Sequence, residues 1–393
     1  MHIPDGYLSP ETCATMYLAA APFWYTALRR VRKLLNTRLV PLLAVFSAFS
    51  FVIMMFNLPL PGGTTGHAVG MGVAAIVLGP WGSMLAVSVA LLIQALFFGD
   101  GGVTAFGANC FNMAIVGSLA AYWVYRAIAG RAAITSTRRV VAAAIAGYVA
   151  INAAALLAAI EFGIQPILFK DAAGAPLYAP YPLSVAVPAM LIGHLTFAGL
   201  AELIVTGGVV AYLQRADPAL LKLTAPGAAD LEEGIQSMAR RGAWRTVRPL
   251  LIGLAVLMVL SPLGLLAAGT AWGEWAPEDF ATSEGRQAIA NASGGQLPPS
   301  GPGGGQLPPR GSGQGPNSAG TPTGLNRLSS VWTAPIPDYA PSFMQSETFG
   351  YIMSAVFGSG LIILAFLLIS GIARAMRSGG EADPASRPGA GTA

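Results

Sequence analysis

Long apolar runs alternate with short polar stretches along most of this 393-residue chain. Most of the runs hold about 20 residues, enough for an α-helix to cross the hydrocarbon core of a bilayer. The third run is shorter, and Gly79-Pro80 separates it from the fourth. The pattern predicts nine segments: residues 8–28, 39–58, 67–78, 81–98, 105–125, 140–160, 183–213, 249–271 and 349–373. We therefore expect an all-α polytopic membrane protein.

Composition agrees with this fold class. Hydrophobic residues make up 54% of the chain and charged residues 10%, whereas a soluble domain carries about 25% charged residues. The net charge of +4 indicates no nucleic-acid partner, because the arginines lie in loops and serve membrane topology. Cys13 and Cys110 lie in or beside apolar segments without CxxC spacing, so we interpret them as small hydrophobic residues.

The distribution of positive charge predicts the orientation. With the N-terminus outside, the inner loops and the C-terminal tail hold 18 of the 22 Lys and Arg residues. Cytoplasmic loops are enriched in these residues. We expect a multi-pass protein of the cell inner membrane with an extracytoplasmic N-terminus and a cytoplasmic C-terminus. The loops before residues 8–28 and 67–78 then lie on the same outer face.

The polar stretches divide the chain. Residues 216–247 form a predicted cytoplasmic connector, and residues 248–375 hold the last two segments. Between the last two apolar segments, residues 281–330 are rich in Gly, Pro, Ser and Gln, which predicts a disordered extracytoplasmic linker. Trp272, Trp275 and Trp332 are interpreted as interfacial aromatic residues, and residues 376–393 as a disordered tail.

Two histidines lie in unusual contexts. The chain opens Met1-His2-Ile3-Pro4-Asp5-Gly6-Tyr7-Leu8, and His67 ends the sequence Pro-Gly-Gly-Thr-Thr-Gly-His. A free α-amine, the amide nitrogen of His2 and its imidazole can close two small chelate rings around one ion, and His67 can supply a fourth nitrogen. Four nitrogens in a plane suit a tetragonal ion such as Ni(II) or Cu(II). The alternative for His2 is a solvated terminus that binds no metal, and the alternative for His67 is a structural histidine held by hydrogen bonds.

The opening differs from a signal peptide, because Asp5 and Glu11 precede the apolar run and no basic residue does. The bulky second residue, His2, should also block removal of Met1 by the usual aminopeptidase, so we expect the mature chain to begin Met1-His2.

Further polar residues lie at membrane depth, where they are functional candidates. Asn109, Asn112 and His194 are predicted to surround the metal site rather than bind the ion directly. Packing roles remain the alternative, above all for Glu202, which lies eight residues, or roughly 12 Å along a helix, after His194. None of the three lysines has the setting of a phosphate-binding loop, so we expect a non-enzymatic chain that carries no ATPase of its own.

These motifs, with Asn-Cys-Phe-Asn-Met at residues 109–113, closely resemble the CbiM/NikM family. Its members are substrate-binding S components of energy-coupling factor transporters for cobalt and nickel. The resemblance covers residues 1–215, and residues 248–375 look like a fused N component with two helices. It implies a seven-helix S-component bundle, Ni(II) or Co(II) as substrate, and metal binding through Met1, His2 and His67.

The resemblance also implies a transmembrane scaffold (T) component and two ATP-binding subunits as partners. Nickel is the expected ion and cobalt the runner-up. A secondary transporter and a non-transport assembly or sensor protein remain the alternatives.

Overall fold

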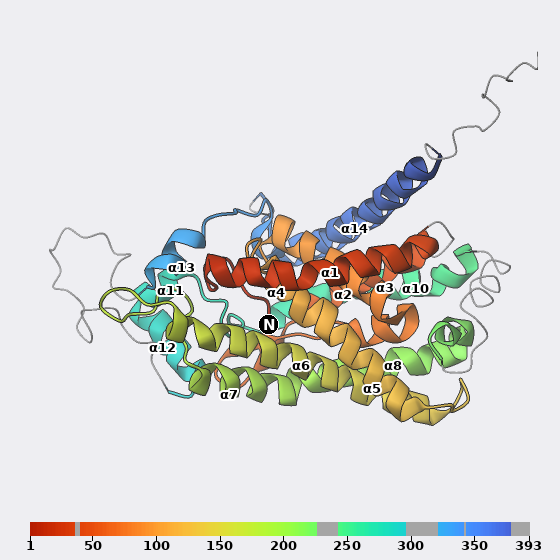
Figure 1. Ribbon diagram of the computed structural model, residues 1–393, viewed down its shortest axis with the longest axis horizontal. Helices are drawn as coiled ribbons and strands as arrows, with labels where there is room; N and C mark the ends of the chain where they lie inside the picture. The colour runs from red at the N-terminus through yellow and green to blue at the C-terminus, as the bar shows by residue number, and fades with distance from the viewer. Residues whose placement is uncertain (36–39, 226–242, 296–320, 342, 379–393) are drawn as a thin grey trace, which may run out of the picture.

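The computed structural model describes residues 1–35, 40–225, 243–295, 321–341 and 343–378. Helices dominate these residues and run along the long axis of the molecule (Figure 1). They begin with α1 (Pro10–Leu35), α2 (Val40–Met54) and α3 (Met71–Ile93), which continues as the π-helix η1 (Gln94–Phe98). A short antiparallel hairpin of β1 (Leu58–Leu60) and β2 (Thr64–Gly66) separates α2 from α3. The prediction of an all-α polytopic membrane protein is confirmed.

The middle of the chain forms three more long segments. The first consists of α4 (Phe106–Asn109), the π-helix η2 (Cys110–Gly117) and α5 (Ser118–Ala129). The second is α6 (Thr137–Leu168), and the third joins α7 (Leu183–Gly193), the π-helical turn η3 (His194–Ala198) and α8 (Gly199–Ala216). The last part holds α10 (Ala243–Leu260) and α14 (Glu347–Ser378), with short helices at the ends of the segment between them.

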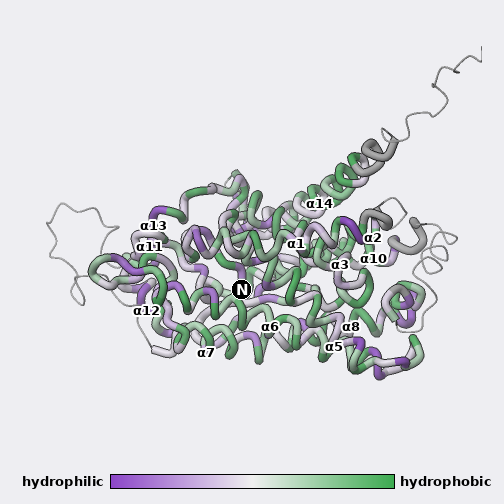
Figure 2. Tube along the Cα trace, in the orientation of Figure 1, coloured by the Kyte–Doolittle hydropathy of each residue, from purple (hydrophilic) through white to green (hydrophobic). Residues whose placement is uncertain are grey.

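Five helices of the described chain are long and apolar enough to cross a membrane: Met71–Phe98, Thr137–Leu168, Leu183–Ala216, Arg248–Leu266 and Glu347–Ile372. The other predicted segments are also helical, although α2 is shorter. Apolar residues dominate the helices, and hydrophilic residues gather toward the two ends of the bundle (Figure 2).

The helix from Met71 folds back on itself at Gly79, as the Gly79-Pro80 sequence predicts. Gly79 has φ 75° and ψ 168°, a backbone conformation open to glycine but rarely to other residues. The Ser83 hydroxyl then donates to the Met71 carbonyl at 3.4 Å, although a straight helix would separate these residues by about 18 Å. The half before Gly79 is thus a short helix that starts directly after the loop carrying His67.

The C-terminal helices pack on the rest of the bundle. Helix α2 contacts α3, α10 and α14. The Tyr351 hydroxyl of α14 donates to the Met55 carbonyl at 2.9 Å, just after α2. The last third of the chain is therefore close enough to contribute residues to a site in the first part.

Two predictions about this last third are wrong. Trp272 and Trp275 are each only 5% exposed and pack with Tyr181 in an aromatic core, so they are not interfacial residues. Trp332, at 44% exposed, is the exception.

The predicted linker is also helical at both ends, in α12 (Ser283–Ala292) and α13 (Thr323–Leu328). These helices form because Ile289 and Leu325 bury their side chains. The middle of the linker (296–320), most of the connector (226–242) and the tail (379–393) lie outside the described residues.

Candidate metal site

The N-terminal segment folds into the bundle instead of extending away from it. Met1 and His2 are 4% and 1% exposed, and the N-terminus lies in the middle of the helices in Figure 1. Asn109 holds the segment through its side-chain amide, which accepts from the Ile3 N–H at 2.8 Å and donates to the Ile3 carbonyl at 3.1 Å. The Gly102 N–H also donates to the Ile3 carbonyl, at 2.8 Å.

Asp5 and Tyr7 fix the rest of the segment. The Asp5 carboxylate accepts from the Val103 and Thr104 N–H groups at 3.0 and 2.7 Å, and from the Thr104 hydroxyl. Gly6 has φ 88°, which lets the chain turn directly afterwards. The Tyr7 hydroxyl donates to the Trp275 carbonyl at 2.7 Å. The terminus is thus held by the loop before α4 and by the C-terminal part of the chain.

The second half of the site is the loop of residues 67–70 between β2 and α3, which we call the His67 loop. The Glu202 carboxylate on α8 accepts from the N–H groups of Val69, Gly70 and Gly72 at 2.8, 2.9 and 3.2 Å. It also accepts from the Thr206 hydroxyl at 3.2 Å. Because the first N–H groups of a helix have no partner within it, Glu202 caps α3 and fixes the loop at the same time.

These two segments bring His2 and His67 together. Their rings are stacked, with centroids 5.0 Å apart and an angle of 28° between the planes. The Nδ1 atom of His67 lies 3.1 Å from the Ala68 carbonyl. As a donor to that carbonyl, Nδ1 carries the proton, and the free lone pair is on Nε2, where a metal ion could bind.

The His2 ring lies against a carboxylate instead of a backbone carbonyl. Its Nδ1 atom lies 2.5 Å from Asp100 Oδ1, but neither ring nitrogen makes a hydrogen bond of acceptable geometry within the described chain. Buried nitrogens without a hydrogen bond are rare, and a metal ligand is one explanation. A chelate through the His2 amide nitrogen requires Nδ1, because Nε2 lies too far around the ring. Nδ1 must therefore leave Asp100 to bind an ion.

The protonation states of His67 and Asp100 favour the binding of a cation. Burial lowers the pKa of His67 to about 3, and the positive charge that His2 and the amino terminus can carry acts in the same direction. His67 is therefore neutral at pH 7, as a metal ligand must be. Burial would raise the pKa of the Asp100 carboxyl, but His2, His67 and the Tyr339 hydroxyl together outweigh this effect, and the pKa lies below its usual value.

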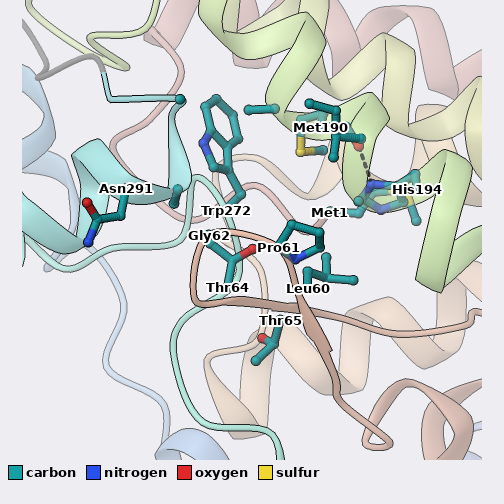
Figure 3. Close-up of a pocket in the computed structure, with 15 residues that line it drawn as sticks. Met1, Leu60, Pro61, Gly62, Thr64, Thr65, Met190, His194, Trp272 and Asn291 are labelled. Atoms are coloured by element: carbon teal, nitrogen blue, oxygen red, sulfur yellow. Dashed lines mark hydrogen bonds between the residues drawn. The ribbon is translucent and has the colours of Figure 1, made fainter.

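The amino group of Met1 is the remaining candidate ligand. It pairs with Glu274 Oε1 at 3.1 Å. Met1 also lines a cavity of about 150 Å³. Figure 3 shows Met1 beside His194 there, with Trp272 and Asn291 toward the opposite side.

The other predicted residues occupy different places. Asn109 holds the Ile3 backbone, not the His67 ring. Asn112 donates to Glu161 at 2.8 Å. His194 lies 2.8 Å from the Met190 carbonyl through Nδ1 and faces the cavity. Of these residues, only His194 lines the cavity beside Met1.

Sequence reasoning missed three residues around the site: Asp100, Glu274 and Tyr339. The Tyr339 hydroxyl donates to Asp100 Oδ2 at 2.5 Å and accepts from the Gln94 side chain at 2.8 Å. Asp100 could have been noticed, since it is an acidic residue in the glycine-rich loop after the fourth predicted segment. Glu274 and Tyr339 carry no local signal of their role.

Among the described residues, no group of three or more His, Cys, Asp and Glu side chains could hold a metal ion. A site built on the two imidazoles would therefore need main-chain nitrogens as its further ligands. The Met1 amine and the His2 amide would join the two imidazoles, which gives four nitrogen donors in a buried setting.

Comparison with known proteins identifies relatives. Residues 2–220 match the family model of the cobalt uptake substrate-specific transmembrane region, CbiM. The fused nickel transport protein NikMN of Rhodobacter capsulatus is 54% identical over 97% of this chain and 100% of its own length. The probable fused nickel transport protein LarMN of Lactiplantibacillus plantarum is 45% identical over 74% of this chain and 82% of its own length.

A crystal structure described as that of a truncated transition metal transporter is also similar. It is 52% identical, with a TM-score of 0.51, over 54% of this chain and 98% of that chain.

Proposed function

This chain belongs to the CbiM family, and from that premise we propose that it is the substrate-binding membrane component of an ATP-driven importer for Ni(II) or Co(II). Two kinds of observation support the proposal. The similarity to a fused nickel transport protein extends over 97% of the chain, and the two histidine rings lie 5.0 Å apart beside the amino terminus.

The ion is bound by four nitrogens in this proposal. The Met1 amine, the His2 amide and the His2 Nδ1 form five- and six-membered chelate rings, and His67 Nε2 completes the set. Small chelate rings fix a tetragonal geometry that suits Ni(II). The mature chain must then keep Met1 with an unblocked amine.

Binding proceeds by displacement. The ion enters from the outer side, the amine and the amide each lose one proton to the solvent as they bind it, and His2 Nδ1 leaves Asp100. His67 needs no deprotonation, because burial already keeps it neutral at pH 7. The N-terminal segment encloses the ion, since Asn109 and Asp5 tie the segment to the body of the protein.

Transport requires partners. A transmembrane scaffold component and two ATP-binding subunits supply the energy, and their movement exposes the site to the cytoplasm. The protein then lies in the cell inner membrane with its N-terminus outside, as the positive charges of the inner loops favour. The similarity to fused nickel transport proteins makes nickel the preferred ion and cobalt the second choice.

The test is titration calorimetry of the purified, untagged chain with Ni(II) and with Co(II). Mass spectrometry of the intact protein first verifies an unblocked Met1. We expect tight binding of one ion per chain, and loss of binding in His2→Ala and in His67→Ala. Normal affinity in either variant would remove that histidine from the ligand set.

Uptake into vesicles tests the transport step. We expect accumulation of the ion only when the scaffold, the ATP-binding subunits and ATP are all present. Uptake by the chain alone would instead indicate a secondary transporter.

A further inference from the structure

The amino group of Met1 contacts a carboxylate that lies 273 residues later in the chain. Glu274 Oε1 is 3.1 Å from the Met1 nitrogen. The Met1 side chain is 1% exposed and the Glu274 side chain 20% exposed. An ion pair this well shielded is screened less than one on the surface, so the contact constrains where the amine points.

Backbone contacts hold the segment around Glu274 in place. Its N–H donates to the Ala271 carbonyl at 3.0 Å in a turn, and Ala271 in turn pairs with Thr65 in an isolated parallel bridge. Thr65 belongs to β2, directly before the His67 loop. The segment that carries Glu274 is therefore joined to the strand directly before the His67 loop.

Aromatic packing on both sides of Glu274 adds to this rigidity. Trp272 packs against Phe162 and Tyr181 with ring centroids 5.8 and 4.8 Å away. The Trp275 carbonyl accepts the hydroxyl of Tyr7, which belongs to the N-terminal segment. Neighbours on both sides of Glu274 are thus fixed to the two segments that supply the candidate ligands.

The Met1 amine can keep its contact with Glu274 when it binds a metal ion, whereas the His2 ring cannot keep its contact with Asp100. A protonated amine has three hydrogens; it gives up one for the ion, and either of the other two can still reach Glu274. An imidazole nitrogen has a single position for a proton or an ion, so Nδ1 must leave Asp100. The Glu274 contact can therefore persist in the metal-bound state, whereas His2 Nδ1 cannot contact Asp100 and the ion at the same time.

Charge favours the same conclusion. A divalent ion with an amide anion, a neutral amine and two neutral imidazoles carries one net positive charge. The carboxylates of Glu274 and Asp100 both lie beside this positive charge in a partly buried site, where Coulomb interactions are stronger than in water. Carboxylates that accept hydrogen bonds from metal ligands orient them and raise their affinity for the ion.

We propose that Glu274 is a positioning residue of the metal site: it orients the Met1 amine toward the ion and accepts a hydrogen bond from it in the bound state. This inference rests on the proposed function. It assigns to the last third of the chain a direct part in metal binding by the first third.

The experiment compares Glu274→Gln with Glu278→Gln in the full-length, untagged chain. Glu278 is exposed, lies four residues away on α11 (Pro277–Ala281), and makes no side-chain contact with Met1 within the described chain. Its substitution removes the same charge without the contact. Affinity for Ni(II) is measured by calorimetry, the ligand geometry by the visible absorption band of bound Ni(II), and the fold by the melting temperature without metal.

We expect Glu274→Gln to weaken Ni(II) binding on the order of tenfold or more and to shift the absorption band. Glu278→Gln should stay within about twofold of wild type, and Glu274→Asp should lie between. Equal affinities and equal bands in the two Gln variants would overturn the inference, even if Glu274→Gln melts earlier. If Glu274→Gln does not fold, Glu274→Asp decides in the same way. A wild-type chain that binds no Ni(II) or Co(II) would overturn the proposed function, and this inference with it.

Discussion

Glu202 offers the sharpest test of how the His67 loop is held. Its two carboxylate oxygens accept four hydrogen bonds, three of them from backbone N–H groups of Val69, Gly70 and Gly72. In Glu202→Gln the amide oxygen can serve Val69 and Gly70. The amide NH₂ then faces Gly72 and the Thr206 hydroxyl, which can reverse and accept.

The magnitude follows from this rearrangement. The Gly72 N–H loses its partner, which costs about 1–3 kcal/mol in a buried site, and two charge-assisted bonds become neutral ones at roughly 0.5–1 kcal/mol each. The total is about 3 kcal/mol. If the loop relaxes without metal and binding must restore it, this cost corresponds to a loss of affinity of up to about a hundredfold.

The assay is calorimetry with Ni(II) on the untagged protein, and the control is Glu161→Gln. Glu161 is also a buried carboxylate in a long helix, but its side chain bonds to Asn112 and not to the His67 loop. We expect Glu202→Gln to weaken binding at least tenfold and Glu161→Gln to leave it nearly unchanged. Wild-type affinity in Glu202→Gln would refute the reasoning that Glu202 fixes the metal-binding loop.

Three further predictions concern the terminus and its neighbours. A short peptide fused before Met1 should abolish Ni(II) binding in calorimetry, because it removes the free amine; a tagged chain that binds normally would exclude the amine as a ligand. Burial lowers the pKa of His67 from 6.5 to about 3, so the unfolded chain takes up a proton there that the folded chain does not. Between pH 7 and pH 5 the wild type should therefore lose about 2 kcal/mol of unfolding free energy in detergent relative to His67→Gln, and parallel pH curves would contradict this. Tyr339→Phe removes the hydroxyl that bonds to Asp100 and Gln94 and should lower the free energy of unfolding by about 2 kcal/mol. Tyr351→Phe, which loses one bond to a carbonyl, should cost less; equal losses would count against the Asp100 network.

The sequence predicts the parts of this protein that depend on local pattern. Apolar runs predict the helices, and Gly79-Pro80 predicts the reversal inside Met71–Phe98, because a left-handed glycine before a proline ends a helix. The pairing of His2 with His67 can also be predicted, since the charge distribution predicts that both loops lie on one face of the membrane.

Long-range contacts could not be predicted in this way. Trp272 and Trp275 follow an apolar segment, as interfacial tryptophans do, and their burial depends on Phe162 in α6 and Tyr181 before α7, which are distant in the sequence. Glu274 lies 273 residues from Met1, and Tyr339 lies 239 residues from Asp100. No periodicity or motif marks such pairs, because they form only when the last third of the chain packs on the rest, as in the Thr65–Ala271 bridge and the contact of α14 with α2.

The central claim is that a free chain start and two imidazoles bind one divalent ion. X-ray absorption spectroscopy of the Ni(II)-loaded, untagged protein tests it most directly, because it reports the number and type of atoms bound to the ion. We predict four nitrogen neighbours in a square-planar arrangement, two of them from imidazoles. A six-coordinate ion surrounded mainly by oxygen would contradict the account.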